Sequence, residues 1–303
     1  MKSVQILFAL LVTGTFLSSC SLEHDSYEIS LEEVVSQYDL WYIDYHKTTG
    51  TGDVPFLSKA FTVSFLNGTL YANNNIVDIG LSGNGLGIRV GNYNTYNGVL
   101  ETNHTLDGGY DFEVYQTSVN EIQIEDTYNN VTYYLVGYQR NNFDYDRLFY
   151  ENIEYFLQEY IAWEKTGTSI SGVVNAFDDE QFLQFTPENN TTFYSSIDPF
   201  GTTIDVINWN FTGAYQVYDI ENYEDLKVLT LNYDNGDNEE FELSVINDST
   251  IRLYHIQSET TYEFSGRGFI QYLKGETPKS VVRNSARKRT KIKREQKIRR
   301  YLK

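Results

Sequence analysis

Residues 112–137 read FEVYQTSVNEIQIEDTYNNVTYYLVG, and residues 241–266 read FELSVINDSTIRLYHIQSETTYEFSG. In both stretches apolar residues alternate with polar ones between turn residues, which is the pattern of half-buried strands. The stretches align without a gap at a constant shift of 129 residues, and each predicts three strands that end at a glycine. The aligned positions are Phe112, Val114, Ile122, Ile124, Tyr133, Leu135 and Gly137, and Phe241, Leu243, Ile251, Leu253, Tyr262, Phe264 and Gly266.

The segments upstream of these two stretches follow one another in the same order. Each copy begins with a helical stretch. Ser30 and Glu33 indicate a capping box before a helix over residues 31–38, and apolar residues have helical spacing over residues 146–160. A tryptophan then occupies the first expected strand, Trp41 in one copy and Trp163 in the other. The simplest account is one domain present twice.

Short strands at close spacing predict an antiparallel meander of about eight strands in each copy, with Asn67-Gly68 as a strong hairpin signal. A helix, a first-strand tryptophan and such a meander resemble the lipocalin-like barrels of bacterial lipoproteins. The resemblance implies a mainly β protein with two tandem antiparallel barrels, residues 31–143 and 144–274, each preceded by a helix. Two β-sandwiches are the alternative.

The N-terminal residues contain an export signal. Residues 4–17 form an apolar run that is too short to cross a bilayer and is typical of a secretory signal peptide. The following residues, Leu17, Ser18, Ser19 and Cys20, resemble the lipobox of bacterial lipoproteins, in which the cysteine is acylated, as with palmitate, and begins the mature chain. The resemblance implies a signal peptide over residues 1–19, a tether over residues 20–30, and lipid anchoring to the envelope, with the outer membrane expected. An ordinary signal peptide with a coincidental cysteine is the alternative.

Charge is distributed unevenly along the chain. The net charge is −19, yet the last thirty residues carry +11, which leaves −30 for the remainder. Residues 275–303 lack the apolar residues for a core and predict a disordered basic tail. Because the acidic body repels anions, contact with an anionic polymer or membrane surface is expected from the tail; folding back on the body is the alternative. The cations proposed for this contact are Arg287, Lys288, Arg289, Lys291, Lys293 and Arg294.

Residues 38–42, 70–75 and 266–272 resemble an uncharacterised family of envelope lipoproteins. Some members are described as nicotinic acid mononucleotide adenylyltransferases. That reaction needs a nucleotide-binding βαβ fold with paired histidines around the transferred phosphate. We do not expect it here, because strands and helices do not alternate and the histidines are scattered. They are His24, His46, His104 and His255.

Other chemical motifs are better explained as structure. Strand-like residues follow Gly83-x-Gly85-x-Gly87, so the segment predicts a loop and not a dinucleotide site. The run 234–237 (DNGD) indicates a hairpin turn more than a calcium site. Asp144 is expected to cap the second helix, and Glu240 and Glu242, which flank an inward Phe241, are expected to face water. No catalytic residue, metal or cofactor is predicted.

These observations favour a non-enzymatic, lipid-anchored envelope protein. Its barrel mouths would take a small apolar ligand, or its surfaces would dock an envelope protein; nucleic acid is not expected, since an exported protein seldom meets it. The alternative is an envelope hydrolase or transferase with a site of carboxylates and tyrosines. Acidic residues with raised pKa in a cleft would favour the enzyme, whereas an apolar cavity open at a barrel end would favour ligand binding.

Overall fold

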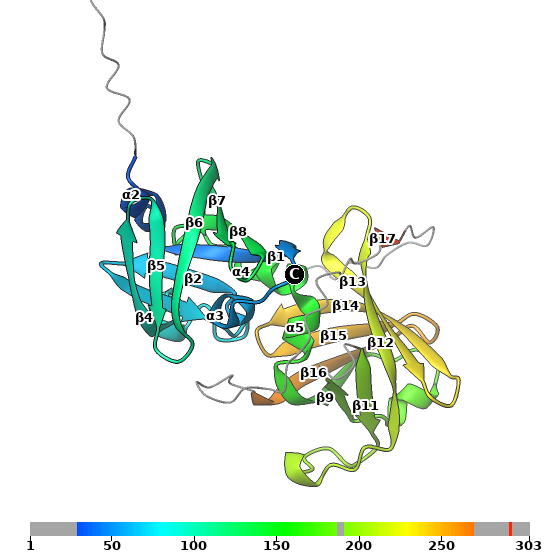
Figure 1. The fold of residues 1–303 in the computed structure, drawn as a ribbon. Coiled ribbons are helices and arrows are strands. Elements are labelled where there is room, and N and C mark those ends of the chain that lie inside the picture. The colour runs from blue at the N-terminus through cyan, green and yellow to red at the C-terminus, as the bar shows by residue number, and fades with distance from the viewer. Residues whose placement is uncertain (1–28, 187–190, 270–290, 293–303) are drawn as a thin grey trace, which may run out of the picture. The chain divides into compact units, whose positions relative to one another are not determined.

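The computed structural model describes residues 29–186, 191–269 and 291–292. In these ranges the protein is mainly β and contains two closed, eight-stranded antiparallel barrels in tandem (Figure 1). The predicted fold class is confirmed, and the two-sandwich alternative is excluded because each sheet closes on itself. Both barrels belong to one compact unit that begins at Leu31.

In the first barrel each strand pairs with the next, and the last strand pairs with the first to close the ring. The hairpin between the second and third strands is the predicted Asn67-Gly68 turn, in which both residues have positive φ, 48° and 76°. The strands are β1 (Leu40–Gly50), β2 (Thr62–Leu66), β3 (Thr69–Asn73), β4 (Ile88–Tyr96), β5 (Val99–His104), β6 (Gly108–Ser118), β7 (Glu121–Asp126) and β8 (Val131–Tyr138).

The second barrel repeats this topology. Its first strand pairs with the second and the last, and its third strand pairs with the fourth. The strands are β9 (Tyr160–Ile170), β10 (Phe182–Phe185), β11 (Thr192–Ser196), β12 (Phe211–Ile220), β13 (Tyr223–Tyr233), β14 (Asn238–Asn247), β15 (Thr250–His255) and β16 (Thr260–Phe269).

The repeat found in the sequence is also a repeat of register. Ile124 lies opposite Tyr133 in the first barrel, and Leu253 lies opposite Tyr262 in the second. Twelve of the fourteen aligned positions are buried, and Val114 and Gly266 are partly buried. The shift of 129 residues therefore superimposes cross-strand partners, as expected if one domain is present twice.

A tryptophan and a glycine form the same local structure in both barrels. The indole nitrogens of Trp41 and Trp163 donate to the backbone carbonyl six residues upstream, at 2.8 Å in each case. The glycine opposite each tryptophan, Gly137 or Gly266, has an aromatic ring against its Cα, so that an added Cβ would lie 2.4 Å from a ring carbon. These contacts join the last strand to the start of the first, where the barrel closes.

We predict that Gly266→Ala destabilises the protein by about 1–3 kcal/mol, because the new methyl group overlaps the ring of Tyr160. That ring cannot easily move away, since its hydroxyl donates to the carbonyl oxygen of Asp248 at 3.1 Å. Gly167→Ala is the matched control, because nothing lies within 4 Å of its added Cβ. Urea unfolding of both variants tests this; equal midpoints would contradict it.

A short helical segment closes one end of each barrel. The ring of Phe56, in α3 (Pro55–Lys59), stacks on that of His104 with the ring centroids 5.2 Å apart. The ring centroids of Phe177, in η2 (Ala176–Asp179), and Phe241 are 4.6 Å apart. Both phenylalanines are buried, and the interior positions behind them carry large aliphatic and aromatic side chains. Pro55 is the first residue of α3, where its missing N–H costs nothing.

The helical segments before the barrels fall near their expected places. Asp144 accepts from the backbone N–H of Arg147 at 2.9 Å, as predicted for a cap. The helix expected over residues 146–160 is broken at Asn152, whose side chain donates to Tyr42 and to the Leu148 carbonyl. The helical segments before the barrels are α2 (Leu31–Ser36), α4 (Tyr145–Glu151) and α5 (Ile153–Leu157). Two further short segments lie between strands of the barrels, η1 (Ser82–Gly85) and η4 (Ile204–Val206).

The expectation that Glu242 faces water is wrong, because its side chain is 5% exposed. It lies on the outer face of β14 between Val228 and Tyr254, its partners on the neighbouring strands. Both of these side chains are buried. Alternation predicts only which side of a sheet a residue faces, and here the outer side is covered.

Candidate functional site

One end of the second barrel holds a pocket of about 630 Å³ beside η2. Its walls come from η2 and the two residues between η2 and β10, from the segment after β11, from the start of β12, and from the β13–β14 hairpin with the adjoining ends of its strands. The lining residues are Ala176, Asp179, Glu180, Gln181, Ile197, Pro199, Phe200, Phe211, Tyr233, Asn235, Asp237 and Glu239.

Lys165, a buried residue of β9 behind the pocket, connects η2 to the barrel through hydrogen bonds. The Lys165 ammonium group donates to the backbone carbonyls of Phe177 and Asp178, each at 3.0 Å. It also lies 4.6 Å from the centroid of the Tyr262 ring, a favourable cation–π position. Burial lowers the pKa of Lys165 to about 8, against the opposing effect of nearby carboxylates led by Glu180.

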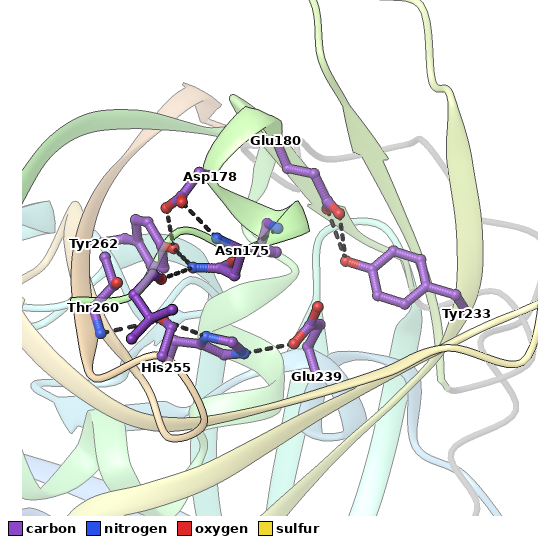
Figure 2. A network of polar contacts seen from close by, with 11 residues as sticks. Asn175, Asp178, Glu180, Tyr233, Glu239, His255, Thr260 and Tyr262 are labelled. Atoms are coloured by element: carbon purple, nitrogen blue, oxygen red, sulfur yellow. Dashed lines mark hydrogen bonds and ion pairs between the residues drawn. The ribbon is translucent and has the colours of Figure 1, made fainter. Parts of the chain in front are cut away.

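Three polar side chains hold the other face of η2 (Figure 2). Asn175 accepts from the N–H of Phe177, and Asp178 accepts from the N–H of Asn175, so that the two form a capping box. The Tyr262 hydroxyl donates to Asp178 at 2.6 Å and accepts from Asn175 at 2.9 Å. The floor of the pocket is therefore rigid, and we do not expect η2 to move when a ligand binds.

A carboxylate and a phenol meet at the pocket wall. Both carboxylate oxygens of Glu180 lie 2.8 Å from the Tyr233 hydroxyl (Figure 2). Burial raises the pKa of Glu180, although hydrogen bonds from neighbouring hydroxyls oppose this effect. Burial, followed by the charge of Glu180, raises the pKa of Tyr233 so far that the phenol stays protonated. The pair lies at a point where a ligand in the pocket would touch it.

Glu239, His255 and Ser258 have the residue types of a hydrolytic triad but not its arrangement. The imidazole Nε2 lies 2.5 Å from Glu239, and Nδ1 lies 2.7 Å from the Ser258 hydroxyl. A serine nucleophile must reach the substrate, yet Ser258 is 3% exposed and does not line the pocket. Only Glu239 faces the pocket, so this chain of contacts positions a carboxylate.

The lining of the pocket is acidic. Four of its lining residues, Asp179, Glu180, Asp237 and Glu239, carry carboxyl groups, and none of the described lining residues is lysine or arginine. Phe200 and Ile197 are 68% and 49% exposed there, which adds apolar surface beside the charge. In the described parts of the chain no three His, Cys, Asp or Glu side chains are placed to hold a metal ion together.

Most residues singled out from the sequence as functional lie outside this pocket. Leu17, Ser18, Ser19 and Cys20, and the tail cations Arg287, Lys288, Arg289, Lys293 and Arg294, lie outside the described residues. Lys291 lies in β17 (Lys291–Ile292), which pairs in parallel with the end of β12. The run 83–87 forms a turn with left-handed backbone before β4, and the run 234–237 forms the β13–β14 turn, both as expected.

Most residues of the pocket were missed in the sequence, although Asp237 lies in the run 234–237. A signal was present for Glu239 and for two residues behind the pocket, Lys165 and His255. Lys165 lies two positions after Trp163, Glu239 two positions before Phe241, and His255 two positions after Leu253. Each therefore continues the inward-facing register of a strand at the end of the barrel. An ionisable residue at an inward position is unusual enough to indicate a polar barrel mouth. Glu180 and Tyr233 had no comparable signal.

No helix of the described ranges is both long enough and apolar enough to span a bilayer. No protein-family model matches this chain. No curated protein is similar enough to be counted as a relative.

Proposed function

We propose that this protein is an exported, lipid-anchored envelope protein that binds a ligand without transforming it. Cys20 carries the lipid, and the pocket of the second barrel takes a ligand with a cationic group on an apolar body. The observation that supports binding of such a ligand is the composition of the pocket, in which four carboxyl groups lie beside exposed aromatic and aliphatic side chains. Its volume lies within the range of about 300–1,000 Å³ usual for small-molecule sites.

The barrel interiors are less suitable for the small apolar ligand expected from the sequence. Phe177, Phe185, Phe193 and Phe241 are buried inside the second barrel, and the first is filled in the same manner around Trp41. Displacing such side chains would cost several kcal/mol each. We therefore place the ligand at the mouth and assign it a positive charge.

The charge preference can be tested with three probes that share a phenyl ring, namely 2-phenylethylammonium, 2-phenylethanol and 3-phenylpropanoate. We expect calorimetry to show the ammonium compound binding at least tenfold more tightly than the neutral one, and the anion least tightly. Asp179→Asn and Asp237→Asn should each weaken the ammonium compound about fivefold, because a carboxylate at 4 Å from a cation contributes about 1 kcal/mol in water. Asp234→Asn is the control, since Asp234 lies in the same turn but does not line the pocket. Equal affinities for all three probes would contradict the proposal.

The Glu180–Tyr233 pair favours one second candidate, a hydrolase that uses carboxyl groups. A buried carboxyl group with a raised pKa is suited to general acid catalysis, and Glu239 in the same pocket offers a second carboxylate. Turnover of 4-nitrophenyl glycosides that is lost in Glu180→Gln and kept in Asp234→Asn would support this candidate over simple binding. Without turnover, Glu180 is a ligand contact only.

A further inference from the structure

A second pocket of about 640 Å³ forms an acidic groove between α4 and the β12–β13 hairpin. Two of its carboxylates are paired with its cations, Glu151 with Arg147 at 2.5 Å and Asp219 with Lys227 at 2.7 Å. The groove keeps an excess of four negative charges. Its carboxylates are Asp144, Asp146, Glu151, Asp219, Glu224 and Asp225, and its cations are Arg147 and Lys227.

Carboxylates on both walls of the groove, α4 and the β12–β13 hairpin, raise the pKa values of the same two side chains. The pKa of Arg147, on α4, is raised chiefly by its hydrogen bond with Glu151, and also by Glu224 of the hairpin. Burial raises the pKa of Tyr150, and Asp225 and Asp146 add to this from opposite walls. The negative charge therefore converges on the space between α4 and the hairpin.

The edge of β12 borders this groove. In the described residues β11 pairs only with Phe211–Ala214 of β12, so the strand extends well beyond its neighbour. Such an edge is a template for an added strand. At its end, Asp219 and Ile220 pair in parallel with Lys291 and Ile292 of β17, and both β12 residues also line the groove.

We propose that the groove and this edge of β12 form a docking site for the basic tail of the same chain, residues 287–300. This segment holds nine lysines and arginines against Glu295, and Lys291–Ile292 lies at its middle. The backbone of β17 supplies the pairing with β12, and the flanking cations supply the charge that the groove lacks. The inference goes beyond the proposed ligand pocket, which lies at other residues.

The connection is long enough for the tail to dock on its own barrel. Between Phe269 and Lys291 the chain can extend over about 70 Å, well beyond the spacing of strands in one barrel. A segment tethered in this manner has an effective concentration in the millimolar range, so weak contacts suffice. While docked, the tail is withheld from an anionic surface, and its apparent affinity falls by the fraction that is free.

Trypsin, which cleaves after lysine and arginine, tests this on the full chain in detergent. We expect slow cleavage within residues 287–300 at about 0.01 M salt and fast cleavage there at about 1 M, where charges are screened beyond a few ångströms. At low salt the variant Asp146→Asn/Glu224→Gln/Asp225→Asn should be cut within this segment about tenfold faster, as expected for a segment docked nine-tenths of the time. Cleavage after Lys274, Lys279 and Arg283, outside the segment, is read separately by mass spectrometry. The same variant should elute from heparin-agarose at a higher salt concentration than the wild type, because its basic tail is free to bind heparin.

The matched control, Asp53→Asn/Asp111→Asn/Glu113→Gln, removes three exposed charges from the first barrel and should behave like the wild type. Cleavage within the barrels reports whether each variant is folded. Equal tail cleavage in all three proteins at low salt would overturn the proposal. Protection that disappears on dilution would overturn it as well, by showing that the tail of a second copy occupies the groove.

Discussion

We expect the protein to lose stability as pH rises from about 4.5 to about 8, and we expect replacement of Glu159 by glutamine to remove most of this loss. The carboxylate follows α5 and is only 2% exposed. It accepts hydrogen bonds from the backbone N–H groups of Ile76 and Val77, in the segment after β3, at 2.6 and 2.8 Å. Burial raises its pKa from 4.5 to about 8, and the two N–H groups only partly oppose this.

The sign of the effect follows from proton binding. Between these pH values the folded protein keeps a proton on Glu159 that the unfolded chain has lost, so unfolding releases a proton. The stability from protonated Glu159 is complete below pH 4.5 and is lost as pH rises to about 8. The free energy of unfolding falls by up to about 1.4 kcal/mol per pH unit in this range.

Urea unfolding at a series of pH values measures this slope. The Glu159→Gln variant does not titrate at this position, so its curve should be flatter than that of the wild type. Glu154→Gln, on α5 and partly exposed, is the matched control and should keep the wild-type slope. Equal slopes in Glu159→Gln and the wild type would show that Glu159 stays ionised when folded. Because two barrels can unfold in separate steps, the midpoints are compared within each step.

The second large effect is expected from Cys20→Ala, which removes the thiol proposed to carry the lipid. Each buried CH₂ group of an acyl chain contributes about 0.8 kcal/mol to membrane binding, so two chains anchor a protein stably where one is marginal. We expect the variant to lose lipid labelling completely and to leave the membrane fraction.

Fractionation after labelling with a palmitate analogue measures both results. Ser21→Ala is the control, because it changes the next residue and leaves Leu17–Cys20 intact. Unchanged labelling of Cys20→Ala would remove the argument for a lipid anchor. Lost labelling with unchanged membrane association would instead assign the attachment to other parts of the chain, such as the basic tail.

The predicted and observed barrels agree best where side chains alternate regularly. Phe112, Ile122 and Tyr133 and their counterparts lie inside the barrels because a period of two places them on one face of a strand. The prediction failed at Glu242 because burial on the outer face depends on Val228 and Tyr254, which lie on neighbouring strands. The period of a strand contains no information on what covers its outer side.

The sequence by itself determined that one β domain occurs twice, since alternating residues, turn signals and a constant shift of 129 are local or repeated features. Only the tertiary structure decided that each sheet closes, and which polar groups meet at a barrel mouth. Glu180 and Tyr233 are 53 residues apart and touch because the ring brings the end of β13 next to η2. Ring closure depends on strand registers summed around the whole barrel, which no single stretch of sequence contains.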